Sequence, residues 1–84
     1  MMQMYPKIIN VELNGDYQLL VTFNNNVVKK LDFLPKLSEP RFEALNNKDL
    51  FDNFQIDQGG YGISWNDEID ISEYEAWTNG ELIN

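Results

Sequence analysis

The chain has 84 residues and a net charge of -8, and it contains neither cysteine nor histidine. A chain of this length forms one small domain, so residues 1–84 are expected to fold as a single unit with a core over about residues 5–80. The missing thiols and imidazoles exclude disulfides, thiolate metal sites and the usual pairing of a nucleophile with a histidine base.

The N-terminal segment, MMQMYPK, has neither the basic region nor the apolar run of a secretory signal. No stretch of the sequence approaches the roughly 20 apolar residues that a membrane span needs. Because cysteine is also absent, we expect a soluble cytoplasmic protein without a membrane partner.

Three consecutive strands are predicted between residues 7 and 33 from apolar residues that alternate along the chain. The inward-facing residues are expected to be Ile9, Val11 and Leu13, then Tyr17, Leu19, Val21 and Phe23, and finally Val27, Leu31 and Phe33. Asn14-Gly15 and the run Asn24–Asn26 supply the turns that tight hairpins require. The segment therefore predicts an antiparallel β-meander.

A short helix is predicted over residues 37–45, where Ser38 would be the N-cap and Leu37 would pack on Phe42. A further single turn of helix is expected to begin at Asn47.

Two further strands are predicted over residues 54–57 and 61–65, joined by a turn at Gln58-Gly59-Gly60. Ser72 and Glu75 then form a capping box for a last helix, EYEAWTN, which ends at Gly80. The predicted fold class is α+β: an antiparallel β-meander with two further strands and short helices packed on one face of the sheet.

The run GGYGISWNDEIDISEYEAWTNG, with MYPKIINVE and YQLLVTFNNN earlier in the chain, resembles the small bacterial proteins described as domain of unknown function 2442 (DUF2442). The resemblance extends over about residues 5–80 and implies a shared α+β fold, but no catalytic residue and no cofactor. Members of this family are often encoded beside a second small protein. For this chain, the resemblance therefore implies an antitoxin-like role. Some members carry a C-terminal helix-turn-helix, which this sequence does not show, so direct nucleic-acid binding is not expected.

Charge is divided unevenly along the chain. All six basic residues lie in the first 48 positions, whereas the last 36 hold nine acidic residues and no basic one. The acidic half repels phosphate groups, and it suits either a basic protein partner or simple solubility.

Aromatic and acidic side chains alternate between residues 61 and 77. Aromatic faces rimmed by carboxylates bind an arginine or lysine through cation–π contacts and charge-assisted hydrogen bonds. The residues predicted to bind a partner are Tyr61, Trp65, Asp67, Glu68, Asp70, Glu73, Tyr74 and Trp77. The competing interpretation of this stretch is structural, with glycines at turns, Trp65 and the isoleucines in the core, and the acids in solvent.

The function expected from these features is a non-enzymatic interaction module for a basic protein, antitoxin-like in role, with no metal and no cofactor. One alternative is a regulatory domain that senses a small cation or metal ion, although the oxygen ligands of residues 66–70 do not have EF-hand spacing. Another is a nucleic-acid-associated regulator that uses Lys29, Lys30, Lys36 and Arg41. Pairing of two copies through a sheet edge is also open.

Overall fold

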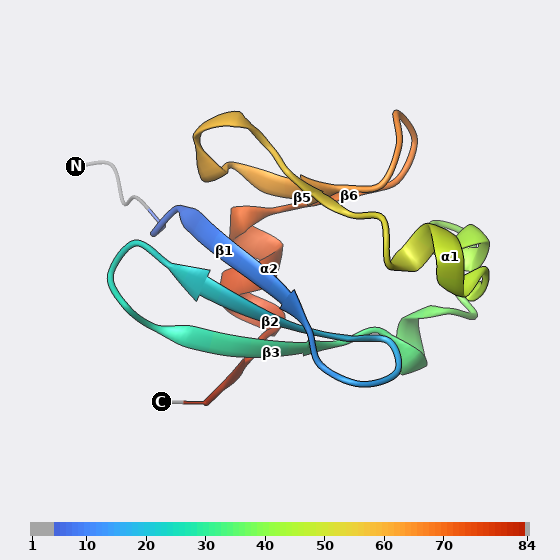
Figure 1. The fold of residues 1–84 in the computed structure, drawn as a ribbon, viewed down its shortest axis with the longest axis horizontal. Coiled ribbons are helices and arrows are strands. Elements are labelled where there is room, and N and C mark those ends of the chain that lie inside the picture. Colours follow the sequence, from blue (N-terminus) through green and yellow to red (C-terminus); the bar gives the residue numbers. More distant parts are fainter. Residues whose placement is uncertain (1–4, 84) are drawn as a thin grey trace.

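The computed structural model describes residues 5–83 and shows an α+β fold with two antiparallel sheets (Figure 1). Residues 1–4 and Asn84 lie outside the described residues. The strands are β1 (Ile8–Leu13), β2 (Gln18–Phe23), β3 (Val28–Asp32), β4 (Gln55–Ile56), β5 (Gly62–Ser64), β6 (Asp70–Ser72) and β7 (Glu81–Leu82). The helices are η1 (Leu34–Lys36), η2 (Glu43–Asn46), α1 (Lys48–Phe51), η3 (Gln58–Gly60) and α2 (Glu73–Asn79).

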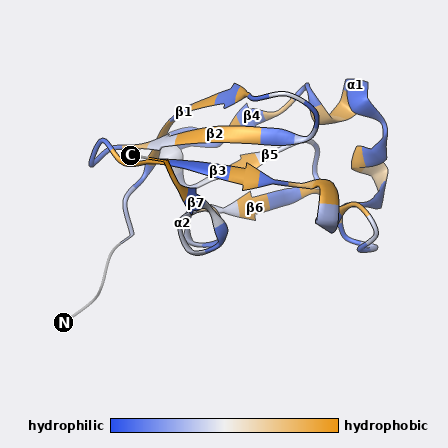
Figure 2. Cartoon of the chain, turned by 90° about the horizontal axis from the view of Figure 1, so that it is seen from below, coloured by the Kyte–Doolittle hydropathy of each residue, from blue (hydrophilic) through white to orange (hydrophobic). Residues whose placement is uncertain are grey.

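The predicted meander is confirmed, because β1, β2 and β3 are consecutive antiparallel neighbours. Leu19, Val21 and Phe23 alternate along β2 and are fully buried, as a half-buried strand requires. The larger sheet has the order β1-β2-β3-β7, and the smaller has the order β4-β5-β6. Hydrophobic residues lie along β1, β2 and β5, whereas the loop between β2 and β3 is hydrophilic (Figure 2).

The predicted inward face of the first strand is wrong at Ile9, and also at Leu13, which ends the strand and is 44% exposed. The register of β1 against β2 shifts between Ile8, which lies opposite Phe23, and Asn10, which lies opposite Thr22. Such a bulge inserts one unpaired residue and reverses the alternation of side chains before it. As a result Ile8 is buried at 2% exposure, whereas Ile9 is 57% exposed.

The helix predicted over residues 37–45 does not form. In its place a series of turns leads from η1 to η2, and the backbone amides of Phe42 and Leu45 donate to carbonyls only three residues back. Ser38 is exposed and caps no helix. The tighter winding suits this segment because Phe42 and Leu45 are both buried and three residues apart, which is one turn of a 3₁₀ helix.

The other short elements follow the sequence more closely. Asn47 is the N-cap of α1, since its side chain accepts hydrogen bonds from the amides of Asp49 and Leu50. β4 and β5 form as predicted and are joined through η3, but β6 and β7 were not predicted. Because β6 and β7 contain three and two residues, they are too short to show an alternating pattern.

Gly60 brings the smaller sheet against β1. Its φ is +78°, and a Cβ atom at this position would lie only 2.3 Å from the carbonyl oxygen of Ile8. This position requires glycine, because no other residue combines that backbone conformation with so short a distance.

The last helix is capped as predicted, with the Ser72–Glu75 capping box at its start and Gly80 at its end. α2 covers one face of the meander (Figure 1) and buries Ala76 completely. None of the described helices has the length and hydropathy that crossing a membrane requires.

Candidate partner-binding surface

The predicted partner-binding residues do not share one surface. Tyr61, Glu73 and Tyr74 lie where β5 and α2 begin, whereas Asp67 and Glu68 lie in the turn after β5, at the other end of that strand (Figure 1). The amide of Glu73 donates to the carbonyl of Tyr61, which places the start of α2 directly beside Tyr61.

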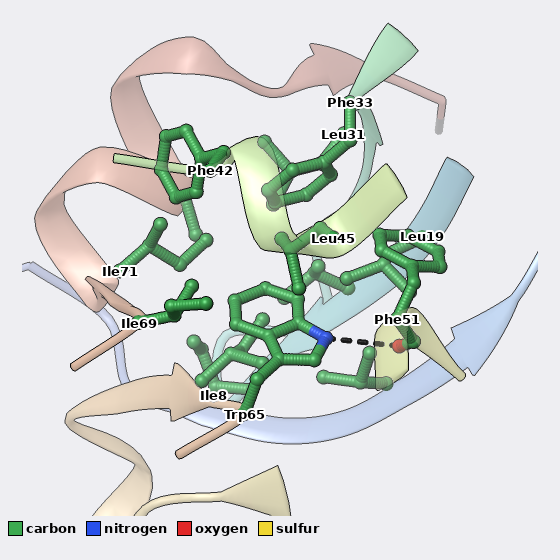
Figure 3. Packing of buried hydrophobic residues seen from close by; sticks show 14 of the residues in the cluster. Ile8, Leu19, Leu31, Phe33, Phe42, Leu45, Phe51, Trp65, Ile69 and Ile71 are labelled. Atoms are coloured by element: carbon green, nitrogen blue, oxygen red, sulfur yellow. Dashed lines mark hydrogen bonds between the residues drawn. The ribbon is translucent and has the colours of Figure 1, made fainter. Parts of the chain in front are cut away.

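Trp65 belongs to the core, so the prediction that it contacts a partner is wrong. Its side chain is 8% exposed and packs on Phe33 and Phe51, with ring centroids 5.4 and 6.1 Å away. The indole Nε1 donates a hydrogen bond of 2.9 Å to the carbonyl of Phe51 (Figure 3). The structural interpretation holds for this residue because the alternation in β5 turns Ile63 and Trp65 to the same buried side.

Trp77 is half-buried and already carries a cation from its own chain. The Lys29 ammonium lies 4.0 Å from the Trp77 ring centroid and donates to the Trp77 carbonyl. The indole also packs edge to face on Phe23, with centroids 5.1 Å apart. The predicted cation–π contact exists here, but the lysine that makes it comes from β3 and not from a partner.

Tyr5, Tyr61 and Tyr74 form a surface group that we call the tyrosine cluster. Tyr61 is 60% exposed and Tyr74 is 49% exposed. The ring of Tyr5 meets that of Tyr74 edge to face at a centroid distance of 4.8 Å. No hydrogen bond within residues 5–83 uses the hydroxyl groups of these three tyrosines, so their polar tips are available to another molecule.

Lys7 holds the tyrosine cluster together. Its ammonium lies 4.6 Å from the centroid of the Tyr61 ring and 3.3 Å from Oε2 of Glu73, and it donates to the carbonyl of Tyr5. These contacts link the segment before β1 to η3 and α2. Sequence reasoning missed Tyr5 and Lys7, because their position beside α2 depends on the packing of the two sheets and no local pattern reports it.

Asp67 and Glu68 form what we call the acidic turn, between β5 and β6. The side chain of Asn66 accepts hydrogen bonds from the amides of Glu68 and Ile69, which orders the backbone of the turn. Both carboxylates are exposed, and neither makes an ion pair within the described residues. The side chain of Asp70 is also exposed, while its carbonyl accepts a hydrogen bond from Arg41.

The two alternative functions would require a metal-binding site or a basic surface for nucleic acid. Residues 5–83 contain no group of three or more acidic side chains arranged to hold a metal ion. In the basic set proposed for nucleic acid, Lys29 lies on Trp77, Lys30 pairs with Glu81 and Arg41 pairs with Glu75. Three of the four basic side chains in this set therefore already interact with groups of the same chain.

The Arg41–Glu75 pair is the strongest ionic contact in this region. The Arg41 guanidinium donates to both carboxylate oxygens of Glu75 at 2.7 Å and to the carbonyl of Asp70 at 2.8 Å. The hydrogen bonds from Arg41 lower the pKa of the Glu75 carboxyl below its ordinary value. The same bonds raise the pKa of the Arg41 guanidinium.

Comparison with known proteins identifies the chain at the level of a family. The family described as Protein of unknown function (DUF2442) matches residues 8–74, from β1 to the start of α2. Tyr61, Glu73 and Tyr74 fall within the matched residues, whereas Tyr5 and Lys7 precede them. No curated protein and no solved structure matches the chain.

Proposed function

The chain belongs to the DUF2442 family, and since that description names no activity, we propose a function from the structure: a non-enzymatic interaction module that binds a basic protein partner. The observation that carries the proposal is the tyrosine cluster, an exposed aromatic surface already ordered by Lys7 and Glu73. An antitoxin-like role is one form of this function, because a module covering a basic surface competes with nucleic acid for it.

The tyrosine cluster has the properties of an interface hot spot. Tyrosine is enriched at such positions because it buries a large apolar ring and still presents a hydroxyl group. Tyr61 and Tyr74 are anchored by Lys7 and Tyr5 respectively, so their rings lose little freedom when a partner binds. This preorganisation supports contact with a folded protein surface.

The charge of the molecule supports a basic partner. The ion pairs of residues 5–83 use Asp52, Glu73, Glu75 and Glu81, which leaves carboxylates such as those of the acidic turn uncompensated. A net charge of -8 steers basic proteins toward the molecule and repels acidic ones. The tyrosine cluster then supplies the close contact, and the acidic turn contributes to the rate of encounter.

We would test the proposal by capture from the native cells, followed by measured binding of the captured protein. The Tyr61→Ala/Tyr74→Ala variant should bind at least about tenfold more weakly, because it removes the anchoring rings. Leu13→Ala/Leu34→Ala is the matched control, since these side chains are 44% and 52% exposed but lie outside the cluster. That control should bind like the unmodified protein.

Reversal of the acidic turn, Asp67→Lys/Glu68→Lys, should lower the association rate at low salt and leave the dissociation rate nearly unchanged. An acidic captured protein would contradict the proposal. So would a basic protein whose affinity is the same for the tyrosine variant and for the unmodified chain.

A further inference from the structure

A second feature lies apart from the tyrosine cluster, in a pocket between β3, β6, α2 and the segment from η1 to Phe42. The pocket has a volume of about 190 Å³, which equals roughly six water molecules in the liquid. A molecule of about the size of one amino acid fits such a space. Leu31, Phe33, Phe42 and Ile71 also line the pocket, but their side chains are at most 5% exposed, so the surface open to a ligand is mainly polar.

One wall of the pocket is the Arg41–Glu75 pair, whose charges are already satisfied. Glu75 accepts two hydrogen bonds from Arg41, and the guanidinium also donates to Asp70 and lies 4.6 Å from the ring centroid of Phe42. This pair shapes the pocket but offers no free charge to a ligand.

The free polar groups of the pocket are the side chains of Lys36, Glu39 and Asn79. None of these three side chains makes a hydrogen bond or an ion pair within residues 5–83. Lys36 is half-buried, and Glu39 and Asn79 are exposed at the rim. The pocket therefore presents one unpaired ammonium, one unpaired carboxylate and one carboxamide around a space whose base is closed by buried apolar side chains.

We propose that this pocket binds a small zwitterion, of which a free amino acid is the simplest example. The ligand carboxylate would pair with Lys36, and its ammonium would pair with Glu39. A simple anion is disfavoured by the net charge of -8, whereas a zwitterion carries no net charge. A simple cation leaves Lys36 without a partner. The proposal is independent of the tyrosine cluster and adds a ligand site to the proposed interaction module.

The test is a titration of ¹⁵N-labelled protein with L-leucine, followed through its amide chemical shifts. Two probes of similar shape each lack one charge: 4-methylpentanoate lacks the ammonium group, and 3-methylbutylamine lacks the carboxylate. Leucine should produce saturable shifts confined to residues 31–42 and 70–79, and each probe should bind at least about tenfold more weakly, as expected for loss of one charged contact.

Two variants separate binding from loss of structure. Lys36→Met should weaken leucine binding at least about tenfold, as the loss of the carboxylate does, while Lys30→Met, which removes the same charge from a lysine outside the pocket, should not. Glu39→Gln should weaken leucine but leave the weak binding of 4-methylpentanoate unchanged. Absence of saturable shifts, shifts outside the pocket, or equal binding of leucine and either probe would overturn the proposal. Equal leucine binding by a well-dispersed Lys36→Met variant would do so too.

Discussion

Arg41 joins its own segment to β6 and α2, which lie about 30 residues later in the chain. It lies in the turns between η1 and η2, yet it binds the side chain of Glu75 in α2 and the carbonyl of Asp70 in β6. The side chains of Arg41 and Glu75 are 45% and 31% exposed, so water screens their attraction and the pair contributes about 1 kcal/mol at most. The bidentate geometry makes it more specific than an ordinary surface ion pair.

The stability contributed by Arg41 should depend on pH. Because the pKa of Glu75 is lowered in the folded state, its contribution is present above the ordinary glutamate value of 4.5 and is lost as pH falls through the folded pKa. The difference in unfolding free energy between the unmodified protein and Arg41→Met should therefore be about 1 kcal/mol at pH 7 and should shrink below pH 4.5.

Urea denaturation at several pH values measures this difference. Lys48→Met, which removes the exposed contact with Asp52, serves as the control and should change stability little. A difference for Arg41→Met that is constant between pH 7 and pH 3 would show that Glu75 is not the group responsible.

Two features of the elements decide how the sheets meet. The bulge in β1 places Ile8 in the core. Gly60, which lies in η3 between β4 and β5, packs against the backbone of that same residue. The chain around η3 therefore packs on β1 without any side chain between them. This contact also positions Tyr61, which follows η3 directly, within reach of Lys7.

Gly60→Ala should destabilise the fold by about 3 kcal/mol, because it adds a clash with the Ile8 carbonyl to the strain of a positive φ. Gly15→Ala is the matched control. Gly15 has a φ of +73°, but a Cβ atom added there would meet no neighbour within 4 Å, so its replacement should cost only about 1 kcal/mol. Chemical denaturation of both variants measures the difference, and equal losses would mean that the contact at Ile8 relaxes without cost.

At the scale of the whole molecule, folding brings some basic residues of the first part of the chain next to acidic residues of the last part. Ion pairs from Lys7 to Glu73, from Lys30 to Glu81 and from Arg41 to Glu75 connect the basic first part of the chain with the acidic last part. These pairs compensate only some of the carboxylates, and the net charge remains -8. Repulsion among the remaining acids opposes the compact state.

Added sodium chloride should therefore raise the melting temperature by a few degrees between about 0.05 and 0.5 M, since it screens this repulsion. Asp67→Asn/Glu68→Gln removes two charges from the acidic turn. It should raise the melting temperature at low salt and reduce the effect of salt. Calorimetry of both proteins tests this, and a melting temperature that falls with salt would show that the ion pairs outweigh the repulsion.

Part of the candidate site was predictable from the sequence, because Tyr61, Glu73 and Tyr74 lie close together in the chain. The chemistry of aromatic rings beside carboxylates and a cation was predicted as well. The source of the cation was not predicted. Lys7 contacts Tyr61 and Lys29 contacts Trp77, and both contacts depend on the packing of segments far apart in the chain. The edges of the larger sheet are β1 and β7, and pairing of two copies through either edge stays a prediction.

The sequence by itself determined the α+β class, the meander and the capped last helix, because periodicity, turn residues and capping boxes act over a few neighbouring positions. It also determined the family, through a match that extends over residues 8–74. Tertiary structure alone decided the bulge at Ile9, the 3₁₀ winding after Pro35, and the burial of Trp65. It also decided which lysine neutralises which acid. Those features depend on contacts between segments far apart in the chain, where packing of the core outweighs local preference.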